Sequence, residues 1–465
     1  MEARNIQFIL SACDGKRFRG ETNFAVQRVC TDSRRAQPGD LFIALRGDRF
    51  DGHEFLGEAA AKGVAAVMID EKKTTMDFPD CAVIIVDDTR KALGKFAARY
   101  RNDFSPAMIA VGGSNGKTTT KELIASVLRQ KLNTLWSDAS FNNDIGVPLT
   151  LLRLENLHQA AVLEAGTNHP GELAPLVKMI RPDFGIVTSI GREHLEFFGN
   201  LEGVADEEGA LAEWLPGKGK LFLNGDNEWT SRIAKRASAD VVRVGFDEIN
   251  HWRATEISPD KSGVSFQVSA PGAEFSGGYR IHLFGRHQVV NALFAICLGA
   301  ELGLNRAEIQ RGLSECPAPK MRLQFCEPNG VGILDDSYNA NLDSMIAALE
   351  TLRDFPCKGR RVAVLGDMAE LGIHSEAAHE QAGRSAAELG VGQLFAVGEM
   401  APVTARGARN AGLNRVLEFN DVDTAAAAVK SFLKPGDVVL LKASRAARLE
   451  RVAELLRGGE AARKN

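Results

Sequence analysis

Residues 107–130 read AMIAVGGSNGKTTTKELIASVLRQ, and this stretch decides the fold class. A short apolar run passes into a glycine-rich loop with Gly116, Lys117 and Thr118, and apolar residues at helical spacing follow. Glycines let successive backbone N–H groups turn toward phosphates, and the start of a helix adds partial positive charge. In this pattern the lysine reaches the β- and γ-phosphates and the threonine hydroxyl binds magnesium. The stretch therefore predicts a loop that binds a nucleoside triphosphate between a strand and a helix.

The loop departs from the strict pattern G-x-x-x-x-G-K-[ST], which would place glycine where this chain has Val111. We interpret it as a shortened variant that begins at Gly112 or Gly113. A glycine-rich turn with a surface lysine is the alternative, and the complete strand, loop and helix context favours the phosphate loop. The residues expected to hold the phosphates are Gly113, Ser114, Asn115, Gly116, Lys117, Thr118 and Thr119.

Two further polar residues follow predicted strands and are candidates for a magnesium site. A magnesium ion at such a loop needs more ligands, commonly a carboxylate at the end of a neighbouring parallel strand. Glu164 ends the apolar run AVLE, where α/β sheets place their ligands, and His194 follows the apolar run 185–190. A solvated acid and a structural histidine are the alternatives. We predict that Thr118 and Glu164 bind one ion and that His194 faces the same crevice.

Segments typical of strands and of helices alternate along the whole chain, which indicates an α/β fold. The clearest strands are short apolar runs, as expected of parallel strands covered on both faces, at 107–111, 161–164, 185–190, 362–366, 394–398 and 438–442. The polar stretch YRNDFSP at 100–106 and the proline-containing stretch CPAPK at 316–320 interrupt the pattern. We therefore predict three domains, at 1–104, 105–316 and 317–465.

The composition excludes several classes of protein. The 465 residues include 56 Lys plus Arg and 60 Asp plus Glu, a net charge of −4, so sequence-independent binding of nucleic acid is not expected. No apolar run approaches the roughly 18 residues of a membrane span, and the start of the chain lacks the pattern of a signal peptide. The nine histidines include no H-E-x-x-H, the pattern of zinc hydrolases. We expect a cytoplasmic monomer.

Motifs in all three predicted domains resemble those of the Mur ligase family. The first domain contains TDSR, PGDLFIALRG and FDGHEF; the second contains GGSNGKTTTKE, SFNNDIGVPLTLL, EAGTNHPGEL, IGREHLEFFG and GRHQVVNAL; the third contains PKMRL, LDDSYNANLDSM, LGDMAELG and LKASRAARLERV. Together these motifs are far more specific than the phosphate loop alone. The resemblance implies a mixed α/β first domain that binds a uridine nucleotide, a central P-loop ATPase domain with a mainly parallel sheet, and a Rossmann-like C-terminal domain.

Within the family, SFNND-IG-P, DDSYNAN, GDM-ELG and K-SR resemble the branch that extends a UDP-N-acetylmuramoyl-tripeptide. The resemblance implies ATP-dependent amide formation in the synthesis of peptidoglycan precursors. ATP would phosphorylate the terminal carboxylate of the tripeptide, and the amine of D-alanyl-D-alanine would attack the acyl phosphate to give the pentapeptide, ADP and phosphate. The implied partners are these two small-molecule substrates, with ATP and Mg²⁺ as cofactors.

The resemblance also implies roles for individual residues. It assigns Lys117, Glu164, His194 and Arg322 to catalysis, with His194 at a second magnesium ion and Arg322 reaching the phosphates from the third domain. It places Asn291 near adenine and Asp336 near ribose. The expected substrate residues are Asp32, Ser33, Arg34, Asn142 and Asn143, with Asp51, Gly52 and His53 as further candidates. Candidates on the ATP or amino-substrate side of the third domain are Asn339, Asn341, Ser444 and Arg445. For each of these polar residues, a turn-stabilising or solvated role is the alternative.

Three positions depart from the family pattern. Family members usually carry a lysine that becomes a carbamate and helps to hold the second magnesium ion, whereas this chain has Glu208 at that position. A glutamate presents a similar negative charge on a shorter stem, so we hypothesise that Glu208, directly or through a water, replaces the carbamate; a bland surface acid is the alternative. Leu342 stands where proline is common and Ala369 where leucine is common, and neither change removes a catalytic group.

Other interpretations stay open at this point. A nucleotide-binding protein that has lost turnover is compatible with the missing lysine. A related ligase with another acceptor, from a neighbouring peptidoglycan step or a folate polyglutamate synthase, is compatible with the phosphate loop, although DDSYNAN and GDMAELG favour the tripeptide enzyme. A dinucleotide oxidoreductase is the weakest alternative, because VAVLGDMAELG contains no G-x-G-x-x-G.

Overall fold

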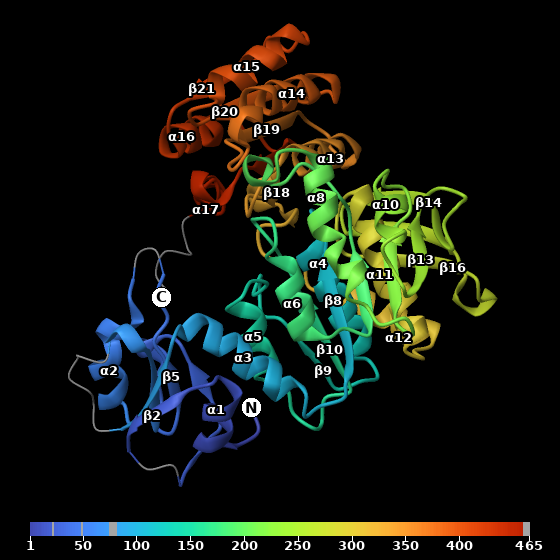
Figure 1. The fold of residues 1–465 in the computed structure, drawn as a ribbon. Coiled ribbons are helices and arrows are strands. Elements are labelled where there is room, and N and C mark those ends of the chain that lie inside the picture. The colour runs from blue at the N-terminus through green and yellow to red at the C-terminus, as the bar shows by residue number, and fades with distance from the viewer. Residues whose placement is uncertain (21–22, 48–49, 74–80, 459–465) are drawn as a thin grey trace.

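The computed structural model describes residues 1–20, 23–47, 50–73 and 81–458. Its elements form three successive parts along the chain, at 4–101, 107–315 and 324–456, each with its own large sheet. Figure 1 shows the middle part between the other two. The sheets are mixed in the first part and mainly parallel in the middle and third parts, so the three-part α/β fold predicted from the sequence is confirmed.

The first part is a small mixed sheet with short helices. Its strands are β1 (Arg4–Asn5), β2 (Lys16–Arg19), β3 (Ala25–Val26), β4 (Val29–Cys30), β5 (Leu41–Ile43), β6 (Ala66–Asp70) and β7 (Ala82–Val86). Its α-helices are α1 (Ile6–Ala12), α2 (Leu56–Ala61) and α3 (Thr89–Arg101). Strands β7, β6, β5 and β4 are parallel, β2 is antiparallel to β7, and β1 pairs with β3 in a separate sheet.

The middle part is a nine-stranded sheet in the order β16-β15-β14-β13-β12-β11-β8-β10-β9. Its strands are β8 (Ala107–Gly112), β9 (Thr134–Trp136), β10 (Ala160–Glu164), β11 (Phe184–Val187), β12 (Lys220–Asn224), β13 (Asp240–Gly245), β14 (Trp252–Asp260), β15 (Gly263–Ser269) and β16 (Gly277–Ile281). Its α-helices are α4 (Lys117–Leu128), α5 (Gly146–Leu151), α6 (Leu173–Ile180), α7 (Leu195–Phe198), α8 (Leu201–Glu208), α9 (Ala210–Glu213), α10 (Thr230–Ala234), α11 (Arg286–Glu301) and α12 (Arg306–Glu315). The pairs β14–β15 and β15–β16 are antiparallel, and the other strand pairs of this sheet are parallel.

The third part is a six-stranded sheet in the order β17-β18-β22-β19-β20-β21, parallel except for β17. Its strands are β17 (Gln324–Cys326), β18 (Gly332–Asp336), β19 (Arg361–Gly366), β20 (Gln393–Val397), β21 (Val416–Phe419) and β22 (Val438–Lys442). Its α-helices are α13 (Leu342–Asp354), α14 (Ser375–Glu388), α15 (Ala401–Asn410), α16 (Val422–Phe432) and α17 (Glu450–Leu456). None of the helices in the described residues is long and apolar enough to cross a membrane.

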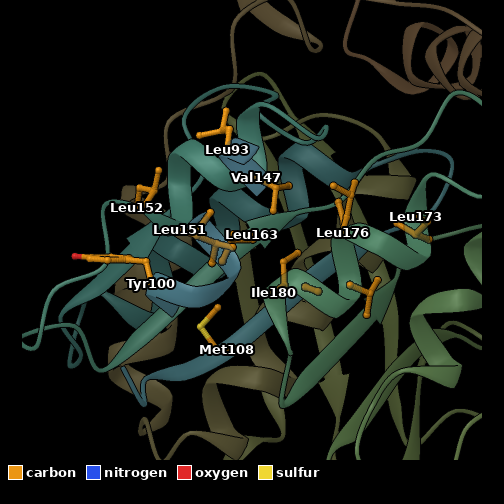
Figure 2. Close-up of a cluster of buried hydrophobic side chains, with 14 of the residues drawn as sticks. Leu93, Tyr100, Met108, Val147, Leu151, Leu152, Leu163, Leu173, Leu176 and Ile180 are labelled. Atoms are coloured by element: carbon orange, nitrogen blue, oxygen red, sulfur yellow. The ribbon is translucent and has the colours of Figure 1, made fainter. Parts of the chain in front are cut away.

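One hydrophobic core joins the first and middle parts through α3. Figure 2 shows Leu93 and Tyr100 of α3 beside apolar side chains of α5, α6 and β10. The phenol of Tyr100 is fully buried; it donates to the carbonyl oxygen of Leu154 at 2.6 Å and accepts the Glu2 N–H at 2.7 Å. Because both hydrogen-bond partners are satisfied, this packing fixes α3 on the middle part without an orphaned polar group.

The parallel register places the ends of β8 and β10 side by side. Glu164, the last residue of β10, pairs with Val111, which lies one residue before the end of β8. The strand predicted at 185–190 is shorter, since β11 ends at Val187. Beyond it the chain leaves the ladder to contact the loop after β8, as the N–H of Ser114 donates to the carbonyl of Ser189 at 2.7 Å. The carboxyl ends of three neighbouring strands thus surround one loop.

Candidate active site

The loop between β8 and α4 requires its glycines. Gly113 and Gly116 have φ of 107° and 88°, a left-handed region that side chains disfavour. A Cβ at Gly113 would lie 2.4 Å from Oγ1 of Thr188, and one at Gly116 would lie 2.6 Å from Oδ1 of Asn291. Helix α4 begins at Lys117, directly after the loop. The local geometry therefore matches the predicted phosphate loop, with the helix N-terminus aimed at its opening.

The side chain of Lys117 is folded over the loop. Its Nζ donates to the carbonyl oxygens of Gly113 at 2.5 Å and Ser114 at 3.2 Å and lies 3.4 Å from Oε2 of Glu193. Burial by itself would lower the pKa of this ammonium. The surrounding carboxylates, led by Glu193, outweigh burial and raise the pKa, so the lysine is held in its charged form.

Thr118 and Glu164, which the sequence predicts to bind one magnesium ion, are in contact with each other. Oγ1 of Thr118 donates to Oε2 of Glu164 at 2.8 Å, and Nδ2 of Asn142 donates to Oε1 of the same carboxylate at 2.9 Å. Nη2 of Arg322, which lies just before β17, donates to Oγ1 of Thr118 at 3.1 Å. An arginine outside the middle part therefore reaches the phosphate loop.

His194 lies at the junction of the middle and third parts. Its backbone is left-handed, with φ of 48°, and its Nδ1 is hydrogen-bonded to Oε2 of Glu370 in the third part. Its Nε2 lies 3.9 Å from Oε2 of Glu193, the same oxygen that approaches Lys117. Because Glu370 is bonded to Nδ1, Nε2 is the ring nitrogen that can bind a ligand in the cavity. Histidines that bind metals commonly have their second nitrogen bonded to a carboxylate in this way.

Glu208 is completely buried behind the phosphate loop. Its Oε2 accepts the N–H of Gly113 at 2.6 Å, whereas its Oε1 is buried with no hydrogen-bond partner among the described residues. Burial is the main cause that raises the pKa of this carboxyl group, and the charge of Lys117 opposes the rise. Glu208 is therefore not a surface acid, and its Oε1 can accept a hydrogen bond that none of the described residues donates.

A cavity of about 1210 Å³ lies in front of the loop, between the middle and third parts. It brings together most residues predicted from the sequence: Ser114, Asn115, Gly116, Lys117, Thr118, Thr119, Asn142, Glu164, His194, Asn291, Arg322, Asp336, Asn339, Asn341, Ser444 and Arg445. Gly113, Asn143 and Glu208 do not line it. Asn143 instead bonds to the first residue of α5, because its Oδ1 accepts the N–H of Gly146 at 2.9 Å.

The residues of the third part are fixed by short contacts. Asp336 forms an ion pair with the buried Lys442 at 2.6 Å. Nδ2 of Asn341 donates to Oδ1 of Asn115 in the phosphate loop at 3.0 Å. Oγ of Ser444 accepts the N–H of Ala369 at 2.8 Å. The Asn341–Asn115 bond joins the third part to the phosphate loop, and the other two contacts order the wall of the third part itself.

The candidates for uridine binding lie in the first part, and none of them lines this cavity: Asp32, Ser33, Arg34, Asp51, Gly52 and His53. The side chain of Arg34 is 83% exposed and pairs with Asp32, whereas Oγ of Ser33 donates to Glu58. His53 is fully buried, and both ring nitrogens are used: Nδ1 bonds Asp51 at 2.6 Å and Nε2 accepts the N–H of Asp70 at 3.0 Å. The buried ring of His53 therefore joins Asp51 to the end of β6 in the interior of the first part.

Sequence reasoning missed several residues of the cavity wall. Glu193 contacts Lys117, and its position beside His194 was the available signal. Nη2 of Arg192 forms an ion pair with Oδ1 of Asp343 in α13 at 2.5 Å. The two residues are far apart in the chain, and no sequence pattern predicts this contact. Gln288 accepts a hydrogen bond from Nδ2 of Asn291 at 2.8 Å, and its place three residues earlier on the same helix made this pair predictable.

The donor set fits magnesium better than a transition metal. Thr118 and Glu164 offer hard oxygen ligands in contact with each other. The described residues contain no group of three or more His, Cys, Asp or Glu side chains arranged to hold a metal alone. Magnesium is typically held by one or two carboxylates with phosphates and waters, so a partial oxygen site at a phosphate loop is the expected form.

Comparison with known proteins places the chain in a family. The models for the Mur ligase family catalytic domain, the Mur ligase middle domain and the Mur ligase glutamate ligase domain match residues 25–101, 111–299 and 321–445. The UDP-N-acetylmuramoyl-tripeptide--D-alanyl-D-alanine ligase of Escherichia coli (strain K12) is 38% identical over 443 residues, which cover 93% of this chain and 94% of that protein. This chain belongs to the Mur ligase family.

Solved Mur ligases share its architecture. A crystal structure of MurF from Acinetobacter baumannii superposes with a TM-score of 0.90 at 31% identity and covers 98% of this chain and 99% of its own. MurF from Thermotoga maritima, solved in complex with ADP, has a TM-score of 0.81 at 27% identity and covers 92% of this chain and 97% of its own. Mur ligases are ATP-dependent, and the cavity described above lies at the loop that the nucleotide requires.

Two departures of this Mur ligase from the family pattern are now placed in the structure. Leu342 is the first residue of α13 and is buried, so it packs directly after the Asn341 cap. Ala369 is exposed at the cavity wall, where its small side chain leaves the space open. Neither position contacts the phosphate loop in any hydrogen bond or ion pair of the described residues.

Proposed function

We propose that this Mur ligase joins D-alanyl-D-alanine to the terminal carboxylate of a UDP-N-acetylmuramoyl-tripeptide, with consumption of ATP. The observation that carries the proposal is the composite cavity, in which Lys117 and Thr118 of the phosphate loop meet Arg322 from beyond the middle part. The E. coli relative, which aligns with nearly the whole chain, is named for this reaction. The products are the UDP-N-acetylmuramoyl-pentapeptide, ADP and phosphate.

The chemistry requires positive charge at the transferred phosphoryl group. The substrate carboxylate and the γ-phosphate of ATP are both anions, and they repel each other at the short distance at which they react. The ammonium of Lys117, held charged by its carboxylate neighbours, offsets this repulsion while the oxygen–phosphorus bond forms and ADP leaves. The amine of D-alanyl-D-alanine then attacks the acyl phosphate, loses a proton and expels phosphate. Arg322 donates toward the same oxygens in both steps.

Magnesium is part of the proposal, and Thr118 and Glu164 would hold it. When bound, the ion would neutralise charge on the phosphates of ATP. Asn142 orients the Glu164 carboxylate through its hydrogen bond to Oε1, which leaves Oε2 directed at Thr118. His194 is the proposed ligand of a second ion, with its Nδ1 held by Glu370.

The remaining residues are assigned by their place in the cavity. Asn291 lies against Gly116, and we assign it to the adenine side; Asp336 is assigned to ribose. The uridine nucleotide is assigned to the first part, at 32–34, with domain boundaries near 104 and 316. Because the reaction consumes ATP, we propose a cytoplasmic location. We also propose that the protein is a monomer.

We also propose that Glu208 replaces the carbamylated lysine of other members: burial raises its pKa to about 8 in the ligand-free chain, and it would supply the negative charge once Mg²⁺ is bound in front of the loop. Its carboxylate is one of three that raise the pKa of Lys117, and its buried Oε1 has no partner among the described residues. It does not line the cavity, so it would act from behind the loop, directly or through a water. If Glu208→Ala leaves both the activity and its dependence on Mg²⁺ unchanged, this assignment is wrong.

The function is tested by ADP release with two substrates. We expect release that requires both the UDP-sugar tripeptide and D-alanyl-D-alanine, and tripeptides that differ at the third residue should compete with different KM values. ADP release with another amine acceptor in place of D-alanyl-D-alanine would assign the chain to a different ligation step. Binding of ATP without release of ADP under any combination would contradict the proposed enzyme altogether.

Two threonines of α4 provide a matched pair for the magnesium site. Thr118→Val removes the hydroxyl that contacts Glu164, and we expect kcat to fall about 100-fold, the effect of losing one charge-stabilising group. Thr120→Val is the control, because Thr120 is also buried on α4 and its hydroxyl has no partner among the described residues. Equal activity of the two variants would refute the role of Thr118.

A further inference from the structure

The backbone on both sides of Arg322 adopts an uncommon conformation. Met321 and Leu323 have φ of 56° and 49°, in the left-handed region that non-glycine residues rarely adopt. Such conformations persist only where the surroundings impose them, and they cluster at functional sites. Here the N–H of Tyr338 donates to the carbonyl of Met321 at 3.1 Å, and the N–H of Leu323 donates to Oδ1 of Asp336 at 3.1 Å. The segment 336–338 therefore fixes the backbone that presents Arg322.

The side chain of Tyr338 also supports the guanidinium of Arg322. The Cζ atom of Arg322 lies 4.4 Å from the centre of the Tyr338 ring, within the range of a cation–π contact. From this position Nη2 of Arg322 donates to Oγ1 of Thr118. The flat guanidinium is thus held between the ring and the phosphate loop.

The hydroxyl of Tyr338 contacts the middle part. It is hydrogen-bonded to Oγ of Ser140 at 2.8 Å, in the loop between β9 and α5. The same loop carries Asn142, which donates to Oε1 of Glu164, while Oε2 of Glu164 accepts from Thr118. The contacts therefore close a ring that starts and ends on the 137–145 loop.

We propose that Tyr338 is a positioning residue that aligns Arg322 with the phosphate loop and joins this alignment to Ser140. The inference rests on the proposed function for the role of Arg322 at the phosphates. Without the ring, the side chain of Arg322 could adopt many rotamers, held only by its bond to Thr118 among the described residues, so its charge would be spread over a larger volume. Without the hydroxyl, the third part would lose one of the contacts by which it meets the 137–145 loop.

Two single variants remove the same hydrogen bond from opposite sides. We expect Tyr338→Phe and Ser140→Ala each to lower kcat about 5- to 10-fold, the effect of one positioning hydrogen bond, with the KM for the UDP-sugar tripeptide within twofold of wild type. The double variant should be no slower than the slower single variant, because one bond is lost in all three. Tyr338→Leu, which also removes the ring beneath Arg322, should lower kcat further.

Tyr279→Phe is the matched control. Tyr279 also donates its hydroxyl to one acceptor, the carbonyl of Phe275 at 2.8 Å, and it lies in β16 away from the cavity. Its kcat should equal that of wild type.

Hydrogen exchange of the ligand-free chain gives a readout that does not depend on turnover. The amides of residues 321–323 should exchange at least threefold faster in Tyr338→Phe and Ser140→Ala than in wild type, and at the wild-type rate in Tyr279→Phe. Values of kcat within twofold of wild type, additive losses in the double variant, or unchanged exchange each overturn the proposal. If the wild-type chain releases no ADP but the exchange difference is found, the proposed function fails and the positioning contact stands.

Discussion

Glu208 should make the stability of the ligand-free chain depend on pH in a way that Glu208→Gln abolishes. The carboxyl is fully buried, and its pKa is raised from 4.5 to about 8, chiefly by burial. Between these values the folded chain keeps a proton that the unfolded chain releases. Stability is therefore fully present below pH 4.5 and is lost as the pH rises toward 8. At 1.36 kcal/mol for each unit of pKa, the loss is on the order of 2–5 kcal/mol.

Glutamine at 208 keeps an oxygen that can accept the N–H of Gly113 and has no charge to bury. We expect Glu208→Gln to match the wild-type melting temperature at pH 5 and to exceed it by about 4–20 °C at pH 8.5, from about 2–4 °C for each kcal/mol in a part of this size. Thermal unfolding followed by fluorescence at half-unit steps of pH measures the difference directly. Glu213→Gln, which changes a half-exposed glutamate on the neighbouring α9, is the control with no trend.

A melting-temperature difference between Glu208→Gln and wild type that stays constant from pH 5 to 8.5 would refute the reasoning, since it would show that Glu208 does not titrate in this window. A variant less stable than wild type at pH 8.5 would refute it as well, because the charged carboxylate would then be a net stabilising partner of Lys117.

Three further predictions follow from single contacts. Gly113→Ala should abolish binding of ATP, measured by titration calorimetry, because φ of 107° is strained for alanine and its Cβ would lie 2.4 Å from Thr188. Binding of ATP at wild-type affinity would contradict the assignment of this loop to the phosphates. Arg322→Lys should lower kcat about 10- to 100-fold with folding intact, since lysine lacks the planar fork that donates to Thr118; a kcat close to wild type would remove Arg322 from the mechanism. Tyr100→Phe should lower the free energy of unfolding by about 1–3 kcal/mol in urea denaturation without a change in kcat, because the buried carbonyl of Leu154 and the part-buried N–H of Glu2 lose their partner. An unchanged unfolding midpoint would mean that water replaces the phenol.

The local motifs were predictable because each depends on a short run of residues. The phosphate loop follows from glycine, lysine and threonine spacing, and β8 and α4 form where the apolar pattern placed them. Glu164 was predictable because parallel strands bring their carboxyl ends to one edge of a sheet. The end of β11 was not, because its last predicted residues bond to the loop after β8 and leave the ladder.

Contacts between distant segments could not be read from the sequence in the same way. Arg322 was assigned to the phosphates only through family resemblance, and its support by Tyr338 and Ser140 depends on how the third part packs on the middle part. Burial was equally hidden from the sequence: a surface acid was one interpretation of Glu208, yet packing places it behind Gly113 with no exposure. His53, a binding candidate in sequence, is enclosed by its own loop.

The sequence by itself determined the α/β class, the phosphate loop and the family, because periodicity and motif spacing are properties of neighbouring residues. Only the tertiary structure decided which charges face the cavity, which are buried behind it, and which side chains of the third part reach the loop. The physical reason is that desolvation and pairing depend on what surrounds a group in space. For Lys117, Glu208 and Arg322, that surrounding comes from segments that lie tens to hundreds of residues away in the chain.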